Sequence, residues 1–377
     1  MKIAIDISQI VYKGSGVGRY TEDLVHSLLR YDQTNEYILF GSTIRQNEVF
    51  NSFILTLKNY NNVTWKHIFL PITFLNILWN RFHVINLETF LGPIDVLHSS
   101  DWIQPPTRAK KVTTVHDMIV YKFPETSHQY IIDTQKRRLQ WVKKECDVII
   151  ADSKATKDDL CTKLEVEESR IVVIYPGINL SFRPQSKDEV DRVKRKYSLF
   201  GDYILTVGIQ EPRKNLKSIF SAFEILLNKT SRNSKAKLVN LVVVGKKGWG
   251  SELKLSQSIR YLNYIDSKDL PPLYSGAICF VYPSIYEGFG LPVLEAMACG
   301  CPVITSDRGS LIEIAGDSAL FANPLKASDI AEKVDQIFTD DDLRKSLIKK
   351  GKVNALKFSW QKTAEQVLDL YNKINLE

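Results

Sequence analysis

The chain has 377 residues, too many for one ordinary folding core, and its length predicts two domains of roughly 150 to 200 residues each. Its composition, with 44% hydrophobic, 10% aromatic and 25% charged residues, is that of an ordered globular protein, so disorder is not the default expectation. The formal net charge of +7 leaves room for attraction to nucleotide phosphate or anionic lipid, but it does not indicate a nucleic-acid partner.

The cysteines and the first residues indicate the cellular compartment in which the protein is expected. The five cysteines include no Cys-x-x-Cys pair and predict reduced thiols, and no nearby histidine completes a zinc site around Cys299 and Cys301. The chain starts as a strand rather than as a signal peptide, and no apolar stretch of about 18 residues follows. We therefore expect a cytoplasmic protein, with peripheral contact at the inner face of the membrane as an option.

In the first half of the chain, short β-branched runs alternate with amphipathic stretches. Helices are expected at residues 19–30 and 134–145. The expected strands are residues 2–7, 37–40, 96–98, 111–115, 148–151 and 171–174. This alternation favours βαβ units on a parallel sheet.

Turn residues at 175–177 and 182–184 interrupt the pattern, and a second alternating series follows. Its expected strands are residues 203–207, 239–244, 278–282 and 303–306. The series predicts a second doubly wound α/β domain. We place the domains at residues 1–184 and 185–357, and we expect a closing helix in residues 358–377 from its apolar spacing.

A glycine loop, Gly14-Ser15-Gly16-Val17-Gly18, leads from the first strand into a helix expected near Tyr20. Gly16 and Gly18 would let backbone amides approach an anion, although a tight strand-to-helix turn needs glycine even without a ligand. The loop departs from the Gly-x-Gly-x-x-Gly fingerprint, and no acidic residue follows the second strand. The pattern therefore argues against an NAD site.

Two adjacent cations, Arg213 and Lys214, follow the first strand of the second domain. At the carboxyl end of a strand they could hold a diphosphate and stabilise its charge as it leaves. A solvated pair in a surface turn is the alternative.

Two carboxylates follow the strand at 278–282. Glu287 lies on the loop after the strand, and Glu295 is expected in the first turn of a helix at 293–299. A carboxylate there could bind vicinal hydroxyl groups, and the glycines flanking Phe289 would let a sugar or phosphate approach the backbone. The alternative is that Glu295 only complements the positive end of the helix dipole and that Glu287 is solvated.

The segment from Glu287 to Gly300, followed by Pro302-Val303, resembles the Glu-x7-Glu motif of glycosyltransferase family 4. Other similar pieces span the chain: the glycine loop, His116-Asp117, Asp152-Ser153, Tyr175-Pro176-Gly177, Pro212-Arg213-Lys214-Asn215 and Phe358-Ser359-Trp360. The resemblance implies the GT-B fold, with two facing Rossmann-like domains and a deep cleft. It also implies that the first domain binds the acceptor, that the second binds the donor, and that the last helix returns to the first.

The resemblance also implies roles by position. Arg213 and Lys214 would bind the diphosphate, Glu295 the ribose, and Glu287 the transferred sugar, with His116 touching that sugar from the first domain. A simple hydrogen bond to Asp117 is the alternative for His116. The remaining donor-binding candidates are Gly16, Gly18, Gly288, Phe289, Gly290 and Leu291.

One position departs from many family members, which carry arginine directly after the glycine that ends the first strand of the second domain. This chain has Ile209 there, and Arg213 is expected to supply the charge. The resemblance implies retention of configuration without a metal, a cofactor or a covalent intermediate. Asp340-Asp341-Asp342 precedes a helix, where acidic residues need no metal to explain them.

The acceptor side is less defined. Residues 63–91 are rich in aromatic side chains interleaved with basic ones, which fits either a strand with core helices or a surface that rests on a membrane to meet a lipid-linked acceptor. Trp102 beside Asp101, and residues 123–125, are candidates for an acceptor channel.

With these features, the resemblance implies a retaining glycosyltransferase, and our leading hypothesis places it in polysaccharide biosynthesis. It would move a hexose from UDP-glucose or GDP-mannose to a saccharide or lipid-linked acceptor. A sugar-nucleotide epimerase on the same scaffold, and a nucleotide-binding subunit without activity, are the alternatives.

Overall fold

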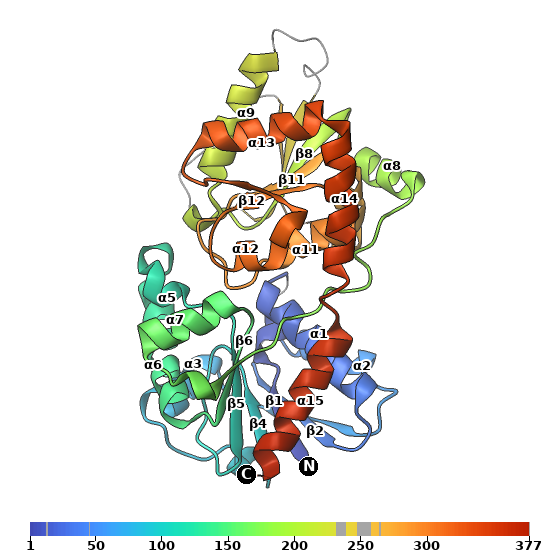
Figure 1. Ribbon diagram of the computed structural model, residues 1–377. Coiled ribbons are helices and arrows are strands. Elements are labelled where there is room, and N and C mark those ends of the chain that lie inside the picture. The colour runs from blue at the N-terminus through green and yellow to red at the C-terminus, as the bar shows by residue number, and fades with distance from the viewer. Residues whose placement is uncertain (13, 45, 231–238, 247–257, 264, 377) are drawn as a thin grey trace. The chain divides into compact units, whose positions relative to one another are not determined.

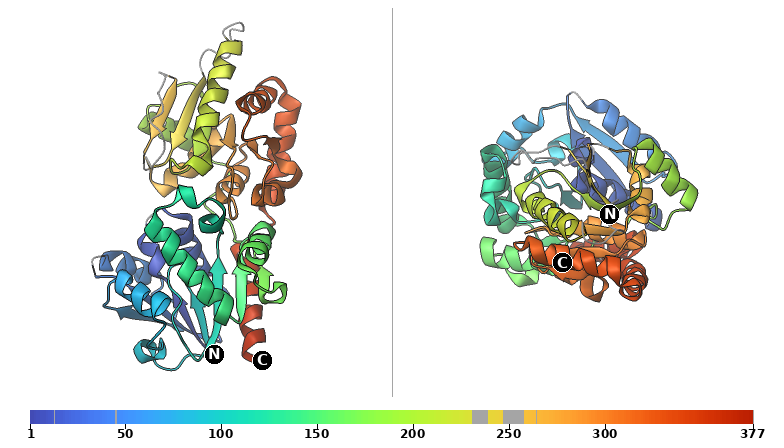
Figure 2. Two further views of the ribbon diagram at one scale, coloured as in Figure 1. Left: turned by 90° about the vertical axis from the view of Figure 1, so that its left-hand side faces the viewer. Right: turned by 90° about the horizontal axis from the view of Figure 1, so that it is seen from above.

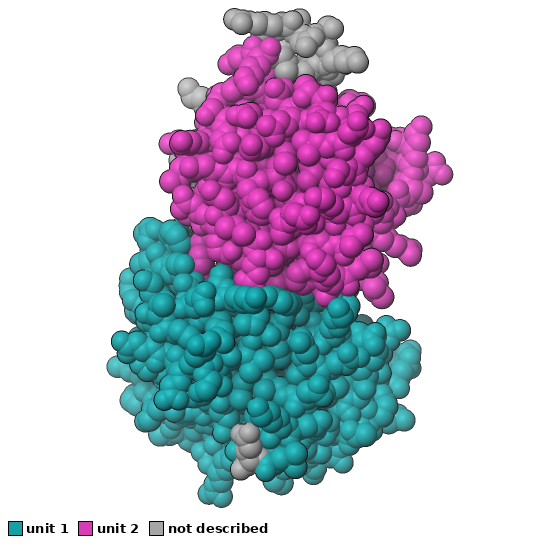
Figure 3. Space-filling model, viewed as in Figure 1, with its two compact units in different colours: residues 1–177, 359–377 teal, residues 178–358 magenta. Residues whose placement is uncertain are grey.

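The computed structural model describes residues 1–12, 14–44, 46–230, 239–246, 258–263 and 265–376. The chain forms two compact units, Met1–Gly177 with Ser359–Glu377, and Ile178–Phe358. Figure 3 colours these units separately and shows that the C-terminal segment belongs to the first. The sequence had suggested a boundary at residue 184.

The first unit is built on a parallel sheet, whose seven described strands have the order β3-β2-β1-β4-β5-β6-β7. The strands are β1 Lys2–Asp6, β2 Glu36–Ser42, β3 Val63–Ile68, β4 Val96–Ser99, β5 Lys110–Val115, β6 Val148–Ala151 and β7 Ile171–Val173. The helices are α1 Gly16–Tyr31, α2 Asn47–Thr56, α3 Ile72–Leu75, α4 Glu88–Leu91, α5 Ile119–Lys122, α6 Gln129–Glu145, α7 Lys154–Leu164 and α15 Trp360–Leu376, with a π-helical turn at Asn76–Arg81.

The second unit has a smaller parallel sheet, with the described strands in the order β10-β9-β8-β11-β12-β13. The strands are β8 Asp202–Val207, β9 Val239–Val244, β10 Ile259–Leu262, β11 Cys279–Tyr282, β12 Val303–Ser306 and β13 Leu320–Ala322. The helices are α8 Lys187–Lys196, α9 Leu216–Thr230, α10 Leu270–Gly276, α11 Leu291–Ala298, α12 Ser310–Ala315, α13 Ala327–Thr339 and α14 Asp341–Ala355.

Both sheets are buried on two faces, which explains their nearly continuous apolar strands. In β1, Ile3 and Ile5 face a core that includes side chains of α1 and α15, whereas Ala4 belongs to a second core with Trp79. Helix α15 packs against α1 through one apolar face, and the two lie side by side in Figure 1. In the second unit, α9 packs against α13, as Figure 2 also shows.

Each sheet contains a topological switch point, where the strands on either side of the first strand wind in opposite directions. In the first unit it lies between β1 and β4, and in the second between β8 and β11. Ligands of such sheets bind outside the carboxyl ends of the strands at this point. The prediction of two doubly wound α/β domains is confirmed.

Several local predictions were incomplete. The short strands β10 and β13 were missed because brief apolar runs carry little periodicity. Residues 63–91 contain both a strand, β3, and short helical segments, and the buried Trp79 anchors them. Helix α1 begins at Gly16 rather than near Tyr20, because the Ser15 hydroxyl accepts a hydrogen bond from the Gly18 amide and caps the helix there.

Candidate functional site

The cations Arg213 and Lys214 lie at the switch point of the second unit. They belong to a 3-10 turn, Pro212–Lys214, between β8 and α9. Asn215 ends this turn in the left-handed conformation, with φ 59°. Its side-chain amide donates to the carbonyl oxygens of Pro283 and Pro324, so the turn is fastened to the loops that follow β11 and β13.

Glu287 binds both cations. Its Oε2 lies 2.9 Å from Arg213 Nη1, and its Oε1 lies 2.7 Å from Lys214 Nζ. The Tyr282 hydroxyl, at the end of β11, donates to the same Oε1 at 2.9 Å and also accepts a hydrogen bond from Lys214. Arg213 Nε donates to Glu211 at 2.8 Å. The alternative interpretation, in which Arg213 and Lys214 are a solvated pair, is therefore wrong, because only 16% of the Arg213 side chain and 14% of the Lys214 side chain are exposed.

The charges of this cluster set its protonation. Burial alone would raise the pKa of Glu287, but the charges of Lys214 and Arg213 outweigh it and lower the pKa to about 2. Burial lowers the pKa of Lys214, although Glu287 pulls it upward. Burial and the neighbouring Glu287 raise the pKa of Tyr282 well above 10, so this hydroxyl stays a neutral donor.

Glu295 is the fifth residue of α11, so it lies in the second turn of the helix, not in the first as the sequence suggested. The helix begins earlier because Gly290 precedes it with φ 112° and Pro292 suits its first turn. Glu295 is 3% exposed and accepts a hydrogen bond of 3.2 Å from the Tyr274 hydroxyl. Glu295 is therefore not a solvated residue that only complements the helix N-terminus.

A row of packed aromatic rings supports both glutamates. Tyr274, which binds Glu295, packs edge-on against Phe280 with ring centroids 5.2 Å apart. Phe280 stacks on Tyr282, which binds Glu287, at 5.5 Å. The two carboxylates are thus held by rigid neighbours.

The turn from Gly288 to Leu291 depends on glycine. A Cβ at Gly290 would lie 2.7 Å from Leu311 Cδ2, and the positive φ is also costly for other residues. Phe289 is buried and meets Phe358 edge-on, with centroids 5.9 Å apart. The Ser310 hydroxyl donates to the Glu287 carbonyl oxygen at 2.8 Å, which fixes the start of the turn.

In the first unit, His116 follows β5 and pairs with Asp152, which follows β6. Val115 and Ala151 are partners in the sheet, so the next residue of each strand lies beside the other. His116 Nδ1 lies 2.6 Å from Asp152 Oδ2. The alternative bond to Asp117 is wrong, because Asp117 Oδ1 accepts from the Ile119 amide at the start of α5.

Asp152 controls the charge of His116. Burial would lower the pKa of His116, but the charge of Asp152 and the hydrogen bond to it raise the pKa above the usual 6.5. The neighbouring His98 is different: burial, together with the charge of His116, lowers its pKa to about 3. His98 lies between Tyr371 and Thr114, 2.5 and 2.9 Å away, and joins β4 to α15.

Asp152→Asn is expected to lower the pKa of His116 relative to the wild type, because the largest charge that opposes burial is lost while the smaller contributions of Asp101 and Asp117 remain. In the wild type the pair stabilises the fold at pH values below 6.5, and this contribution is lost as the pH rises through the higher folded pKa. Histidine ring NMR signals followed against pH measure the change. Asp117→Asn is the matched control and should lower the pKa of His116 by less, because Asp117 is a smaller contributor; an equal shift would contradict the assignment to Asp152.

The glycine loop has two kinds of glycine. A Cβ at Gly18 would lie 3.0 Å from Ser15 Oγ and 3.1 Å from the Gln9 carbonyl oxygen, so packing explains this glycine. A Cβ at Gly16 would meet nothing within 4 Å. Packing therefore does not explain Gly16.

Several other sequence features have structural roles. Asp340 caps α14 by accepting a hydrogen bond from the Leu343 amide at 2.8 Å. All five cysteines are unpaired. Within the described ranges, no three His, Cys, Asp or Glu side chains are grouped as a metal would need, and no helix is long and apolar enough to cross a membrane.

The sequence interpretation assigned no role to Tyr282, Tyr274, Glu211 and Asp152. Only Asp152 had a usable signal, since His116 and Asp152 each directly follow a predicted strand, and these two strands are neighbours in the sheet. The tyrosines belong to apolar runs and look like core residues until their hydroxyl partners are known.

Comparison with known proteins agrees with this architecture. Residues 14–182 match the family model described as Glycosyltransferase Family 4, and residues 189–354 match Glycosyl transferases group 1. O-antigen chain mannosyltransferase B of Escherichia coli is 30% identical, over 98% of this chain and 99% of that protein. O-antigen chain mannosyltransferase RfbU of Salmonella typhimurium is 30% identical over 58% of each chain.

Solved structures show the same fold. The structure of Anabaena HepE with UDP and glucose aligns with a TM-score of 0.72 and 15% identity, covering 99% of both chains. Sucrose-phosphate synthase of Thermosynechococcus elongatus aligns with a TM-score of 0.73 and 20% identity, also covering 99% of both chains. The likeness to these GT-B proteins, and the full-length similarity to the Escherichia coli enzyme, lead to one conclusion: this chain belongs to glycosyltransferase family 4 and is a glycosyltransferase with the GT-B fold.

Proposed function

We propose that this protein transfers a mannosyl residue from GDP-mannose to a saccharide acceptor during synthesis of a surface polysaccharide, with retention of configuration. The mannosyl donor is favoured over UDP-glucose because relatives at 30% identity are named as O-antigen mannosyltransferases. The observation that supports donor binding is the pair Arg213 and Lys214, held at the switch point of the second unit.

The cluster is suited to a diphosphate leaving group. An ammonium has three N–H donors, and Glu287 and Tyr282 account for two of those of Lys214 among its described neighbours. A phosphate oxygen would take the third and share the charge of Arg213. The two cations stabilise the negative charge that develops as the sugar–phosphate bond breaks.

Glu287 orients these cations, and in our proposal it also binds the transferred sugar. Its low pKa keeps it ionised, so it accepts hydrogen bonds from cations and from sugar hydroxyl groups alike. Glu295, with one oxygen held by Tyr274, binds the ribose hydroxyl groups. His116 contacts the donor sugar, and the reaction uses no metal, cofactor or covalent intermediate.

The test is a donor panel with a defined acceptor. With octyl α-D-mannoside, we expect transfer from GDP-mannose that persists with a chelator and gives a product with the donor's anomeric configuration by NMR. Transfer from UDP-glucose alone would reject the donor, and an inverted linkage would reject retention. Conversion of the donor in the absence of acceptor would indicate an epimerase.

We include a lipid-linked acceptor and peripheral membrane contact in the proposal. Between β3 and α4, apolar side chains are exposed on the first unit: Phe69 by 73%, Phe82 by 63%, and Phe74, Ile77 and Ile85 by 48% each. Such side chains could enter the headgroup layer of a bilayer. Flotation with phosphatidylglycerol vesicles tests this contact, and protein that stays at the bottom of the gradient would reject it.

A further inference from the structure

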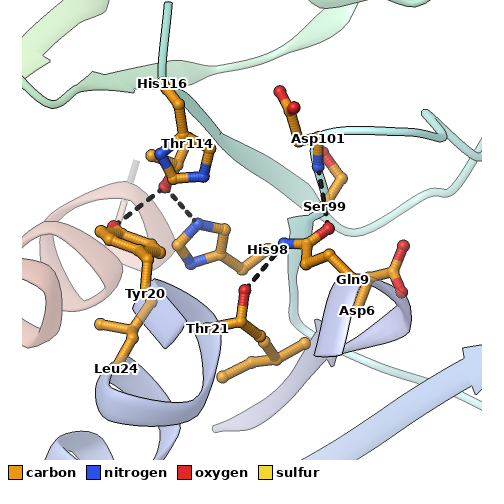
Figure 4. A pocket seen from close by; sticks show the side chains of 11 residues that line it. Asp6, Gln9, Tyr20, Thr21, Leu24, His98, Ser99, Asp101, Thr114 and His116 are labelled. Carbon is orange, nitrogen blue, oxygen red and sulfur yellow. Dashed lines mark hydrogen bonds between the residues drawn. The ribbon is translucent and has the colours of Figure 1, made fainter. Parts of the chain in front are cut away.

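A small pocket, lined mostly by residues that carry polar groups, lies at the switch point of the first unit. It is lined from the carboxyl ends of β1, β4 and β5 and from the first turns of α1. Figure 4 shows Asp6, Gln9 and Asp101 on one side of it, and Tyr20, Thr114 and His116 on the other. The space open to a water molecule is about 10 Å³, close to that of one water or hydroxyl group.

Asp6, at the end of β1, is the unusual residue of this pocket. It is 2% exposed, and its Oδ1 accepts hydrogen bonds from the Ser8 amide at 2.8 Å and the Ser8 hydroxyl at 2.5 Å. Its Oδ2 is buried and has no hydrogen-bond partner among the described residues. A buried carboxylate oxygen without a partner is costly, so a ligand that donates a hydrogen bond would remove a penalty.

The neighbours of Asp6 are fixed in place. The Gln9 amide donates to Thr21 at 2.9 Å and accepts from the Asp101 backbone at 3.3 Å. Arg138 is fully buried and donates to Asp101 Oδ1 at 3.1 Å. These bonds leave Gln9 and Arg138 little freedom to turn toward Asp6 Oδ2.

Charge indicates what kind of ligand fits. Burial raises the pKa of Asp6, while the hydroxyls of Ser100 and Ser8 and the charge of Arg138 partly offset this. The Ser100 hydroxyl lowers the pKa of Asp6, but it makes no hydrogen bond to Oδ2. Asp101 is already paired with Arg138, so Asp6 is the carboxylate left to accept a hydrogen bond, and the space is too small for a hydrated cation. A neutral hydroxyl group donates one hydrogen bond and fits the space.

We propose that Asp6 binds a hydroxyl group of the acceptor saccharide and thereby positions the acceptor in the pocket that His116 also lines. This inference rests on the proposed function, since it requires that His116 contacts the donor sugar. The shared pocket gives Asp6 its role: Asp6 and His116 line it from opposite sides, so an acceptor whose hydroxyl group is held by Asp6 would extend across the pocket toward the histidine. Asp6 would be a specificity residue for the acceptor, with no part in donor binding.

The test is Asp6→Asn, which keeps an oxygen for the Ser8 amide but replaces Oδ2 by a nitrogen donor. We expect kcat/KM for octyl α-D-mannoside to fall by about 10-fold to 100-fold, since charge-assisted hydrogen bonds are the stronger ones. The affinity for GDP-mannose and its slow hydrolysis by water should not change. Ser8→Ala is the matched control, because at Asp6 it removes a partner of Oδ1 and none of Oδ2; it also removes the acceptor of the Ser42 amide.

Monodeoxy analogues of octyl α-D-mannoside identify the hydroxyl. One analogue should be a poor acceptor for the wild type, and its kcat/KM should not fall further in Asp6→Asn. An equal loss for every analogue, a similar loss in Ser8→Ala, or weaker donor binding would overturn the role of Asp6. If Asp6→Asn does not fold, the wild type alone decides, since an acceptor series in which no single hydroxyl matters contradicts the proposal.

The two proposals fail in different ways. A wild type that transfers mannose from no donor rejects the proposed function. A wild type that transfers mannose while Asp6→Asn keeps full acceptor kinetics rejects only the role of Asp6.

Discussion

Glu287→Gln is expected to reduce kcat by at least about 100-fold, the size of effect seen when one charge-stabilising group leaves an active site. The amide keeps the shape of the side chain, but the charge that orients Arg213 and Lys214 is lost. Steady-state transfer kinetics measure this effect, and we expect KM for the donor to change much less than kcat.

The same substitution should destabilise the protein. Removing one partner leaves two cations near a neutral amide, which we expect to cost about 1 to 3 kcal/mol, because the site is not fully closed to water. Since the folded-state pKa of Glu287 is depressed to about 2, its stabilisation is present above the unfolded value of 4.5 and is lost as the pH falls toward 2. The difference in Tm between wild type and variant should therefore shrink in acid.

Glu211→Gln is the comparison for Glu287→Gln, because Glu211 also binds Arg213. It should have a smaller effect on turnover, as it leaves Lys214 paired. Equal losses in the two variants would mean that Glu287 acts only by holding Arg213.

Lys214→Met is expected to weaken binding of the nucleotide diphosphate by about 10-fold to 100-fold, corresponding to one lost charge-assisted hydrogen bond. Methionine retains an apolar stem that can pack near Gly208, where a Cβ would lie 3.5 Å from Lys214 Cδ. Calorimetry with GDP and with GMP tests whether the effect depends on the second phosphate. The loss of affinity should be large for GDP and small for GMP.

The control for Lys214→Met is Lys217→Met, because Lys217 is an exposed cation on the neighbouring helix α9. The variant has the same change in net charge, so a general electrostatic effect would appear in both. If Lys214→Met bound GDP as tightly as the wild type, the diphosphate would have to be held elsewhere.

The sequence determined the fold class and the positions of the motif residues, because these depend on local pattern. Apolar runs of strand length alternating with amphipathic helices specify a doubly wound sheet, and such strands end where ligands bind. The Glu-x7-Glu segment, with its glycines and proline, indicated the family and the place of Glu287 and Glu295 after β11. The helix start was misplaced by two residues, since helix boundaries depend on caps that a pattern shows poorly.

The tertiary structure alone decided which polar groups meet. Glu287 binds cations that lie more than 70 residues earlier in the chain, and only the pairing of β8 with β11 brings them together. The same holds for His116 with Asp152, and for the unpartnered oxygen of Asp6, whose neighbours come from different strands. Hydrogen bonds act over about 3 Å, so partners far apart in sequence are fixed by the register and order of the strands.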